Sequence, residues 1–180
     1  MKIIEKVAAT MLLSTTFLFV FAAPVSAFVP DIEIPSESQT WTEETCSRYD
    51  NKIDRKIRRY EWHHQVQLER YQDRAGRIQN IIDEYAPRGH DVTKLRDDLR
   101  VWNEKIADFD GDYTALINKL KEAMEFTCWS SRAQMFAKLR EAKGLRDIVD
   151  ADMEDMSNFY FGTVKLDIAE MKKQKHITAE

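Results

Sequence analysis

The sequence has few residues that interrupt a helix. It contains five glycines and four prolines among 180 residues, and no proline follows Pro87. It also has no long stretch in which apolar and polar residues alternate as they do in a half-buried β-strand. Because proline and glycine most often end helices, their scarcity favours a few long helices. We therefore expect an all-α fold.

The motifs that identify most enzymes are also missing. We find no nucleophile elbow, no glycine-rich phosphate loop and no Cys-x-x-Cys pair. The acidic segment Asp108–Asp112 has its glycine in fourth rather than sixth position, and Lys119 stands where a calcium loop needs Glu. We therefore expect a protein that is not an enzyme and has no catalytic, cofactor-binding or dedicated metal-binding residues.

Long apolar runs are absent except at the N-terminus. Lys2 and Lys6 precede an apolar stretch from Val7 to Ala23, and small residues follow at 25–27 where a signal peptidase reads them. The stretch is shorter than the ~20 residues of a comfortable membrane span, so an uncleaved anchor is the second alternative. We predict that residues 1–27 are a signal peptide, and that the mature chain is periplasmic, bound in the cell envelope or extracellular, without a transmembrane span.

An excess of positive charge is absent as well. The formal net charge is −4, and removal of Lys2, Glu5 and Lys6 with the signal peptide makes it −5. Nucleic-acid-binding proteins are normally basic, with clustered Lys and Arg. We therefore expect no nucleic-acid partner.

The dominant pattern is a stripe of large residues between Cys46 and Ala86. Its members follow one another at steps of three or four residues, and several recur every eleven. Such steps place side chains on one face of an α-helix, and an eleven-residue repeat keeps a long helix nearly straight. The helix needs a partner for this face, because intrinsic propensity alone would not hold it. The predicted stripe is Cys46, Tyr49, Ile53, Ile57, Tyr60, His64, Leu68, Tyr71, Ala75, Ile78, Ile82 and Tyr85.

Capping residues give the expected bounds of the first helix. Thr40 and Glu43 form a capping-box pair, so the helix is expected to begin near Trp41. Pro87 and Gly89 are expected to end it in a short turn.

A second stripe follows this turn. Asp91 is the expected N-cap, and the stripe keeps its phase through Gly111 to about Cys128. We interpret Gly111 as a weak point that costs about 1 kcal/mol relative to alanine but does not end the helix.

A third stripe predicts a third helix. Ser131 and Gln134 form another capping-box pair, although one continuous helix through Trp129 is the alternative because no Gly or Pro marks a turn. The stripe runs to about Met171, and we expect a kink or short break near Gly144.

Three helices of similar length predict an elongated antiparallel three-helix bundle, a coiled-coil hairpin plus a third helix, about 60 Å long at 1.5 Å per residue. The helical domain covers residues 41–172. A flexible N-terminal segment, residues 28–40, precedes it, and a polar tail, residues 173–180, follows it.

The two cysteines are expected to form one disulfide. In an exported chain a pair of cysteines is most simply a disulfide, and a reactive thiol beside Arg48 is the second alternative. Cys46 lies 43 residues before Gly89 and Cys128 lies 39 after it, so an antiparallel hairpin brings both to the same end. The bond could contribute about 4–5 kcal/mol in the chain-entropy model.

One pair of residues suggests a metal site. The same numbering places Asp110 level with His64 across the hairpin, with Asp108, Asp112 and Asp150 at a similar height. Imidazole and carboxylate are common metal ligands. A core histidine hydrogen-bonded to an acid is the commoner arrangement, so we keep a metal-sequestering bundle only as an alternative function. His63 is expected to point away from the stripe.

Charge and methionine distribution suggest binding surfaces. The basic residues Arg48, Lys52, Arg55, Lys56, Arg58 and Arg59 cluster near the start of the first helix, and acids cluster at Asp147, Asp150, Asp152, Glu154 and Asp155. Solvated faces usually look like this, but such a patch also suits a partner, an anionic lipid or a polysaccharide. Methionines 124, 135, 153, 156 and 171 would offer an adaptable apolar surface, although most are expected to fill the core.

The leading functional hypothesis is therefore a non-catalytic binding or scaffold protein that presents long helical faces to another protein, or to another copy of itself as a homo-oligomer. In kind, the chain resembles small exported helical proteins such as the periplasmic chaperones of the Spy and CpxP type, but it lacks their Leu-Thr-x-x-Gln motif. That resemblance implies the alternative of a chaperone-like holdase.

Overall fold

The computed structural model describes residues 31–34, 41–126 and 131–174, and every regular element in these residues is helical. The all-α prediction is confirmed. The predicted signal peptide, Cys128 and residues 175–180 lie outside the described residues. Three long helices, a 3₁₀ turn, a π-helical turn and a short final helix follow one another: α1 (Glu43–Tyr85), η2 (Ala86–Arg88), α2 (Thr93–Met124), α3 (Arg132–Phe159), η3 (Tyr160–Val164) and α4 (Lys165–Lys173).

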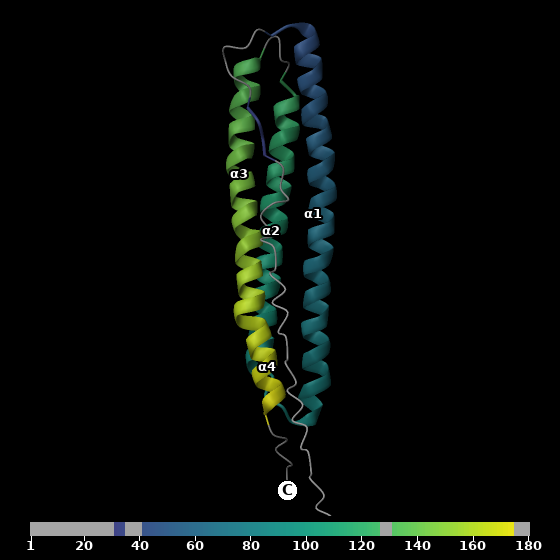
Figure 1. The fold of residues 1–180 in the computed structure, drawn as a ribbon, viewed down its shortest axis with the longest axis vertical. Helices are drawn as coiled ribbons and strands as arrows, with labels where there is room; N and C mark the ends of the chain where they lie inside the picture. Colours follow the sequence, from purple (N-terminus) through teal and green to yellow (C-terminus); the bar gives the residue numbers. More distant parts are fainter. Residues whose placement is uncertain (1–30, 35–40, 127–130, 175–180) are drawn as a thin grey trace, which may run out of the picture.

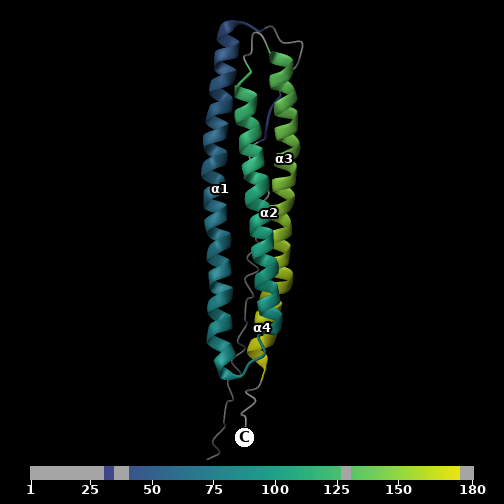
Figure 2. The ribbon, with the colours of Figure 1, turned by 180° about the vertical axis from the view of Figure 1, so that it is seen from behind.

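The three long helices lie side by side, and each runs antiparallel to the one before it (Figure 1). Helix α2 lies between α1 and α3 and packs against both, which the view from behind also shows (Figure 2). No Cα atom of α1, in contrast, lies within 8 Å of a Cα atom of α3. The α1–α3 seam is the boundary between these two helices. The extended segment Asp31–Ile34 lies in this seam, over Leu120 of α2.

Aromatic side chains fill the middle of the core. Tyr60, Trp102, Phe109 and Tyr113 are fully buried. The rings of Tyr71 and Trp102 meet edge to face with centroids 5.8 Å apart, and the Trp102 indole N–H donates to the Tyr71 carbonyl at 3.0 Å. Edge-to-face contacts of this kind stabilise a core beyond the area they bury, so these rings fix the level of α2 against α1.

The buried face of α1 departs from the predicted stripe in its middle third. His63 and Gln67 are buried, whereas His64 and Leu68 are only partly buried. The prediction that His63 points away from the core was therefore wrong. The physical reason is that Tyr113 of α2 offers His63 a hydrogen-bond partner in the core, so a polar residue takes the position that an apolar pattern assigns to its neighbour.

The helix ends are close to the predicted ones but use different caps. Thr42, not Thr40, is the N-cap of α1, and its hydroxyl accepts the Thr45 backbone N–H at 3.2 Å. The Asp91 carboxylate accepts the backbone N–H of Thr93 at 2.9 Å, although Val92 holds the N-cap position of α2. This hydrogen bond lowers the pKa of Asp91.

The predicted kink near Gly144 does not occur, because α3 is continuous from Arg132 to Phe159. A β-carbon added at Gly144 or at Gly111 would meet no atom within 4 Å, so both glycines lie in ordinary helix with open space beside them. The irregularity lies later, in the π-helical turn η3. A π turn inserts an extra residue, which rotates the register of α4 relative to α3.

Candidate functional site

The buried histidine, His63, belongs to a small polar cluster between α1 and α2. Its Nδ1 lies 3.0 Å from the Tyr113 hydroxyl, and its Nε2 lies 3.4 Å from the amide nitrogen of Gln67. Burial lowers the pKa of His63, and the nearby arginines 70 and 59 lower it further. A neutral ring suits this position, since it can accept from Gln67 on one nitrogen and donate to Tyr113 from the other. The cluster is structural.

The neighbouring histidine meets the acid that sequence numbering placed beside it. His64 Nε2 lies 2.8 Å from Asp110 Oδ1, and its ring stacks on Tyr113 with centroids 4.8 Å apart. The contact is close but lacks hydrogen-bond geometry. The predicted level of Asp110 is confirmed. Asp112 and Asp150, expected at a similar height, instead interact with α3 residues Asp152 and Arg146. In the described residues no three His, Cys, Asp or Glu side chains gather as a metal site.

Two carboxyl pairs lie where α2 meets the C-terminal half of the chain. Asp98 of α2 faces Asp167 of α4, and Asp112 of α2 faces Asp152 of α3. Burial, and then the neighbouring carboxyl, raises the pKa of Asp98 to about 6 and that of Asp152 to about 6. Two nearby carboxyls cannot easily both ionise, so each pair favours a bound proton below neutral pH.

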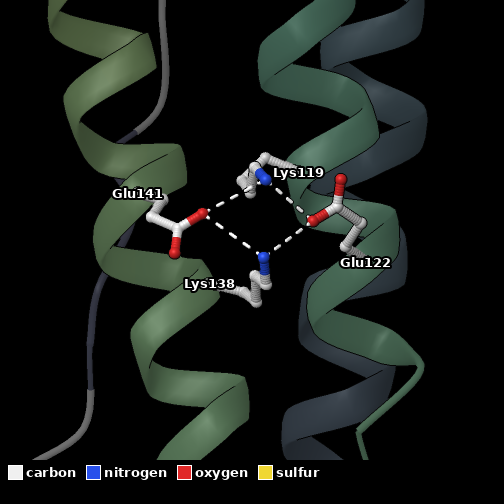
Figure 3. A network of polar contacts seen from close by, with 4 residues as sticks. All are labelled: Lys119, Glu122, Lys138 and Glu141. Carbon is white, nitrogen blue, oxygen red and sulfur yellow. Dashed lines mark hydrogen bonds and ion pairs between the residues drawn. The ribbon is translucent and has the colours of Figure 1, made fainter.

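Another polar group joins the C-terminal part of α2 to the N-terminal part of α3 (Figure 3). Lys119 bridges Glu122 at 2.7 Å and Glu141 at 3.1 Å, and Lys138 reaches the same two carboxylates at 3.1 and 3.5 Å. The hydrogen bond from Lys119 lowers the pKa of Glu122 and that of Glu141. Alternating charges in a closed ring leave no unbalanced charge for a ligand, so this ring fixes helix register and is not a binding site.

The basic residues at the start of α1 divide into two groups. Lys52 binds the Glu33 carboxylate and Lys56 donates to the Asp31 carbonyl, so both turn toward the α1–α3 seam. The others stay on the outward face of α1. The outward basic group consists of Arg48, Arg55, Arg58 and Arg59.

The outward basic group is only partly neutralised. Arg48 and Arg58 pair with Glu44 and Asp54 four residues earlier in α1. Arg55 contacts only the Asn51 carbonyl, and within the described residues neither it nor Arg59 forms an ion pair. An open recess of about 590 Å³ lies among Arg48, Asn51, Lys52, Arg55 and Arg58.

Trp62 extends this face and was not singled out from the sequence as a binding residue. It lies one helical turn beyond Arg58 and Arg59, and it is 61% exposed, among the most exposed large apolar side chains in the described residues. The only signal in the sequence was its position between two stripe residues, where a large aromatic residue has no packing role.

Two of the clustered acids form ion pairs with other residues of the fold, and most of the methionines lie in the core. Asp150 pairs with Arg146, and Asp155 pairs with Lys105 of α2. Four of the five methionines fill the core, as predicted, and only Met124 is exposed. The methionines therefore provide no continuous apolar surface in the described part of the chain.

The chain matches no protein-family model, no curated protein and no solved structure. None of the helices in the described residues combines the length and apolar character needed to cross a membrane. The outward face of α1, from the outward basic group to Trp62, is the best candidate for a functional surface, because Arg55 and Arg59 form no ion pair in the described residues and the Trp62 side chain is exposed.

Replacing Asp98 with asparagine tests the carboxyl pairs. Asp98 is buried, and its folded-state pKa of about 6 lies above its ordinary value of 3.8. Its contribution to stability is therefore greatest below the ordinary pKa and is lost as pH rises through 6. Asparagine copies the neutral carboxyl at every pH. We expect Asp98→Asn to raise the free energy of unfolding by about 1 kcal/mol at pH 7.5, after allowance for solvent screening.

Urea denaturation at pH 7.5 and pH 3 measures this effect. At pH 3, below the ordinary pKa of 3.8, the Asp98 carboxyl is largely neutral in both the folded and the unfolded chain, so the gain should nearly vanish. Glu154→Gln is the control, because Glu154 is exposed and forms no ion pair in the described residues. An equal gain at both pH values would contradict the assignment.

Proposed function

We propose that this protein is an exported, non-catalytic binding or scaffold protein that presents the outward face of α1 to another protein. The observation that carries the proposal is an exposed Trp62 beside Arg55 and Arg59, two arginines with no carboxylate partner in the described residues. Tryptophan and arginine are the residues most enriched among those that dominate protein–protein binding energy. An exposed tryptophan on the same helix face as these two arginines supports a partner that covers all three side chains.

The rigidity of α1 supports the same proposal. The helix runs unbroken over Glu43–Tyr85, and its opposite face is anchored by Ile53, Tyr60, Tyr71 and Ile78 in the core. A surface on such a helix is pre-organised, so a partner loses little affinity to ordering it.

Photo-crosslinking in cells tests this surface. A benzophenone amino acid at position 62 should give a discrete protein adduct in the envelope fraction. The matched control places it at Ile148 of α3, which is also a large apolar residue and is 46% exposed. Replacing Arg55 and Arg59 with glutamate should reduce the adduct at position 62 at least about tenfold, the effect of losing 1.4 kcal/mol of binding energy.

Urea denaturation of the Arg55→Glu, Arg59→Glu variant separates binding from folding. Its free energy of unfolding should differ from that of wild type by no more than about 0.5 kcal/mol, as for other surface substitutions. An adduct found only at position 148 would contradict the proposal. So would an adduct at position 62 whose yield is the same when Arg55 and Arg59 are replaced with glutamate. An adduct with lipid or polysaccharide instead of protein would assign the face to a different partner.

We also propose that the three helices form an elongated antiparallel bundle stapled by a disulfide between Cys46 and Cys128. Support comes from Cys46, which is 4% exposed near the start of α1, at the end of the molecule where α2 ends and α3 begins (Figure 1). Phe126, the last described residue before Cys128, packs against the same core.

The intact mass of protein from the envelope fraction tests the disulfide and export together. Without reducing agent, the mass should be that of a chain beginning at Phe28 and lacking two hydrogens. Reduction should lower the free energy of unfolding by about 4–5 kcal/mol, less any strain in the native bond. A chain beginning at Met1, or two thiols that react with alkylating reagent in the unreduced denatured protein, would contradict these two proposals separately.

A further inference from the structure

The segment Asp31–Ile34 is bound in the α1–α3 seam as a peptide would be. Its backbone is extended, and exposure alternates along it: Ile32 is 3% exposed and Ile34 is partly buried, while Asp31 and Glu33 face solvent. Alternation of this kind is what an extended chain shows when one of its sides is covered.

The apolar floor of the groove comes from all three long helices. Ile32 lies among Ile53 of α1, Leu120 of α2 and Leu139 of α3. Because α1 and α3 do not approach each other directly, the isoleucine completes a core that the helices leave open.

Polar groups on the groove walls bind the segment's backbone and its acids. The Tyr49 hydroxyl donates to the Glu33 carbonyl at 2.9 Å, and Lys56 donates to the Asp31 carbonyl. Lys52 pairs with the Glu33 carboxylate and Arg146 with Asp31 at 2.9 Å. The groove therefore selects an extended segment in which one apolar residue lies between two acidic ones.

Arg146 is positioned by another residue of the groove wall to bind the segment. It occupies a position in the apolar stripe of α3, yet its side chain is only 19% exposed and its guanidinium also binds Asp150 at 3.0 Å. Asp150 thus holds the arginine in place toward the segment. Hydrogen bonds between charged groups of this kind give directional selectivity as well as affinity.

We propose that this groove is an exchange site, which binds the Asp31–Ile34 segment of a second copy of the chain when its own segment leaves. The occupant is argued from its sequence, since every copy carries the one segment that the structure shows the groove to fit. Exchange keeps every contact that the segment makes, which is why it is the low-cost route to dimers known as domain swapping. This exchange does not depend on the binding of another protein to the outward face of α1.

The covalent connection between the segment and α1 explains why the segment of each copy normally occupies the groove of that same copy. A short linker gives the attached segment an effective concentration of about millimolar, so free copies compete only when their local concentration is similar. Exchange would therefore operate where copies are crowded together.

Complementation between two full-length mature variants tests the proposal. In the segment variant, Ile32→Asp prevents the segment from entering a groove that is intact. In the groove variant, Lys52→Glu and Lys56→Glu repel a segment that is intact. Each variant alone should be monomeric. A mixture should form a one-to-one heterodimer in sedimentation and native mass spectrometry, with a dissociation constant at least about tenfold below that for self-association of either variant.

A matched control changes charge without touching the groove. Arg48→Glu with Arg58→Glu makes the same charge change on the outward face of α1 and should not complement the segment variant. A synthetic peptide of residues 29–36 should bind the segment variant and not wild type, and the same peptide with Ile32→Asp should bind neither. If circular dichroism shows that Ile32→Asp prevents folding, Ile32→Ala takes its place.

Two results would overturn the proposal. Mixed variants that stay monomeric while the peptide also fails to bind would show that the segment only covers the core. Peptide binding without a heterodimer would restrict the groove to its own tethered segment.

Discussion

The absence of direct packing between α1 and α3 is the constraint on which the rest of the structure depends. Helix α2 contacts both neighbours, but its third side would face water if nothing covered the seam between them. Asp31–Ile34 covers it, and Lys52, Lys56 and Arg146 hold the segment there. Two of the six basic residues near the start of α1, Lys52 and Lys56, thus serve the fold. Arg55 and Arg59 on the outward face of α1, in contrast, form no ion pair in the described residues, and Trp62 is exposed.

Polar groups inside the helical packing set the register of α2. The His63–Tyr113 contact fixes it against α1, while the Lys119–Glu122–Lys138–Glu141 ring fixes it against α3. Apolar stripes alone permit neighbouring helices to slide by a turn, whereas hydrogen-bonding partners must meet at one level. The carboxyl pairs at Asp98 and Asp152 act in the opposite sense near neutral pH, because they hold like charges together and weaken the C-terminal half.

The number, type and order of the helices follow from the spacing of apolar residues and from the single Pro87–Gly89 break. The level of Asp110 beside His64 follows from counting residues from the turn. Three features do not follow. The burial of His63 depends on Tyr113 in another helix, the π turn at Tyr160–Val164 has no sequence signature, and Asp31–Ile34 lies in the segment that the sequence predicts to be flexible. The last failure is the instructive one, because Asp-Ile-Glu-Ile has the two-residue alternation of a half-buried extended chain but is too short for that period to stand out.

Methyl NMR of the mature wild-type protein tests the packing of Ile32 most directly. With isoleucine and leucine methyl groups labelled, the structure predicts nuclear Overhauser contacts from Ile32 to Ile53, Leu120 and Leu139, together with methyl order like that of the buried Ile78. Such contacts join the N-terminal segment to all three helices at once. A sharp Ile32 methyl signal at its random-coil position, without contacts to Leu120 or Leu139, would contradict the closed seam and the exchange site built on it.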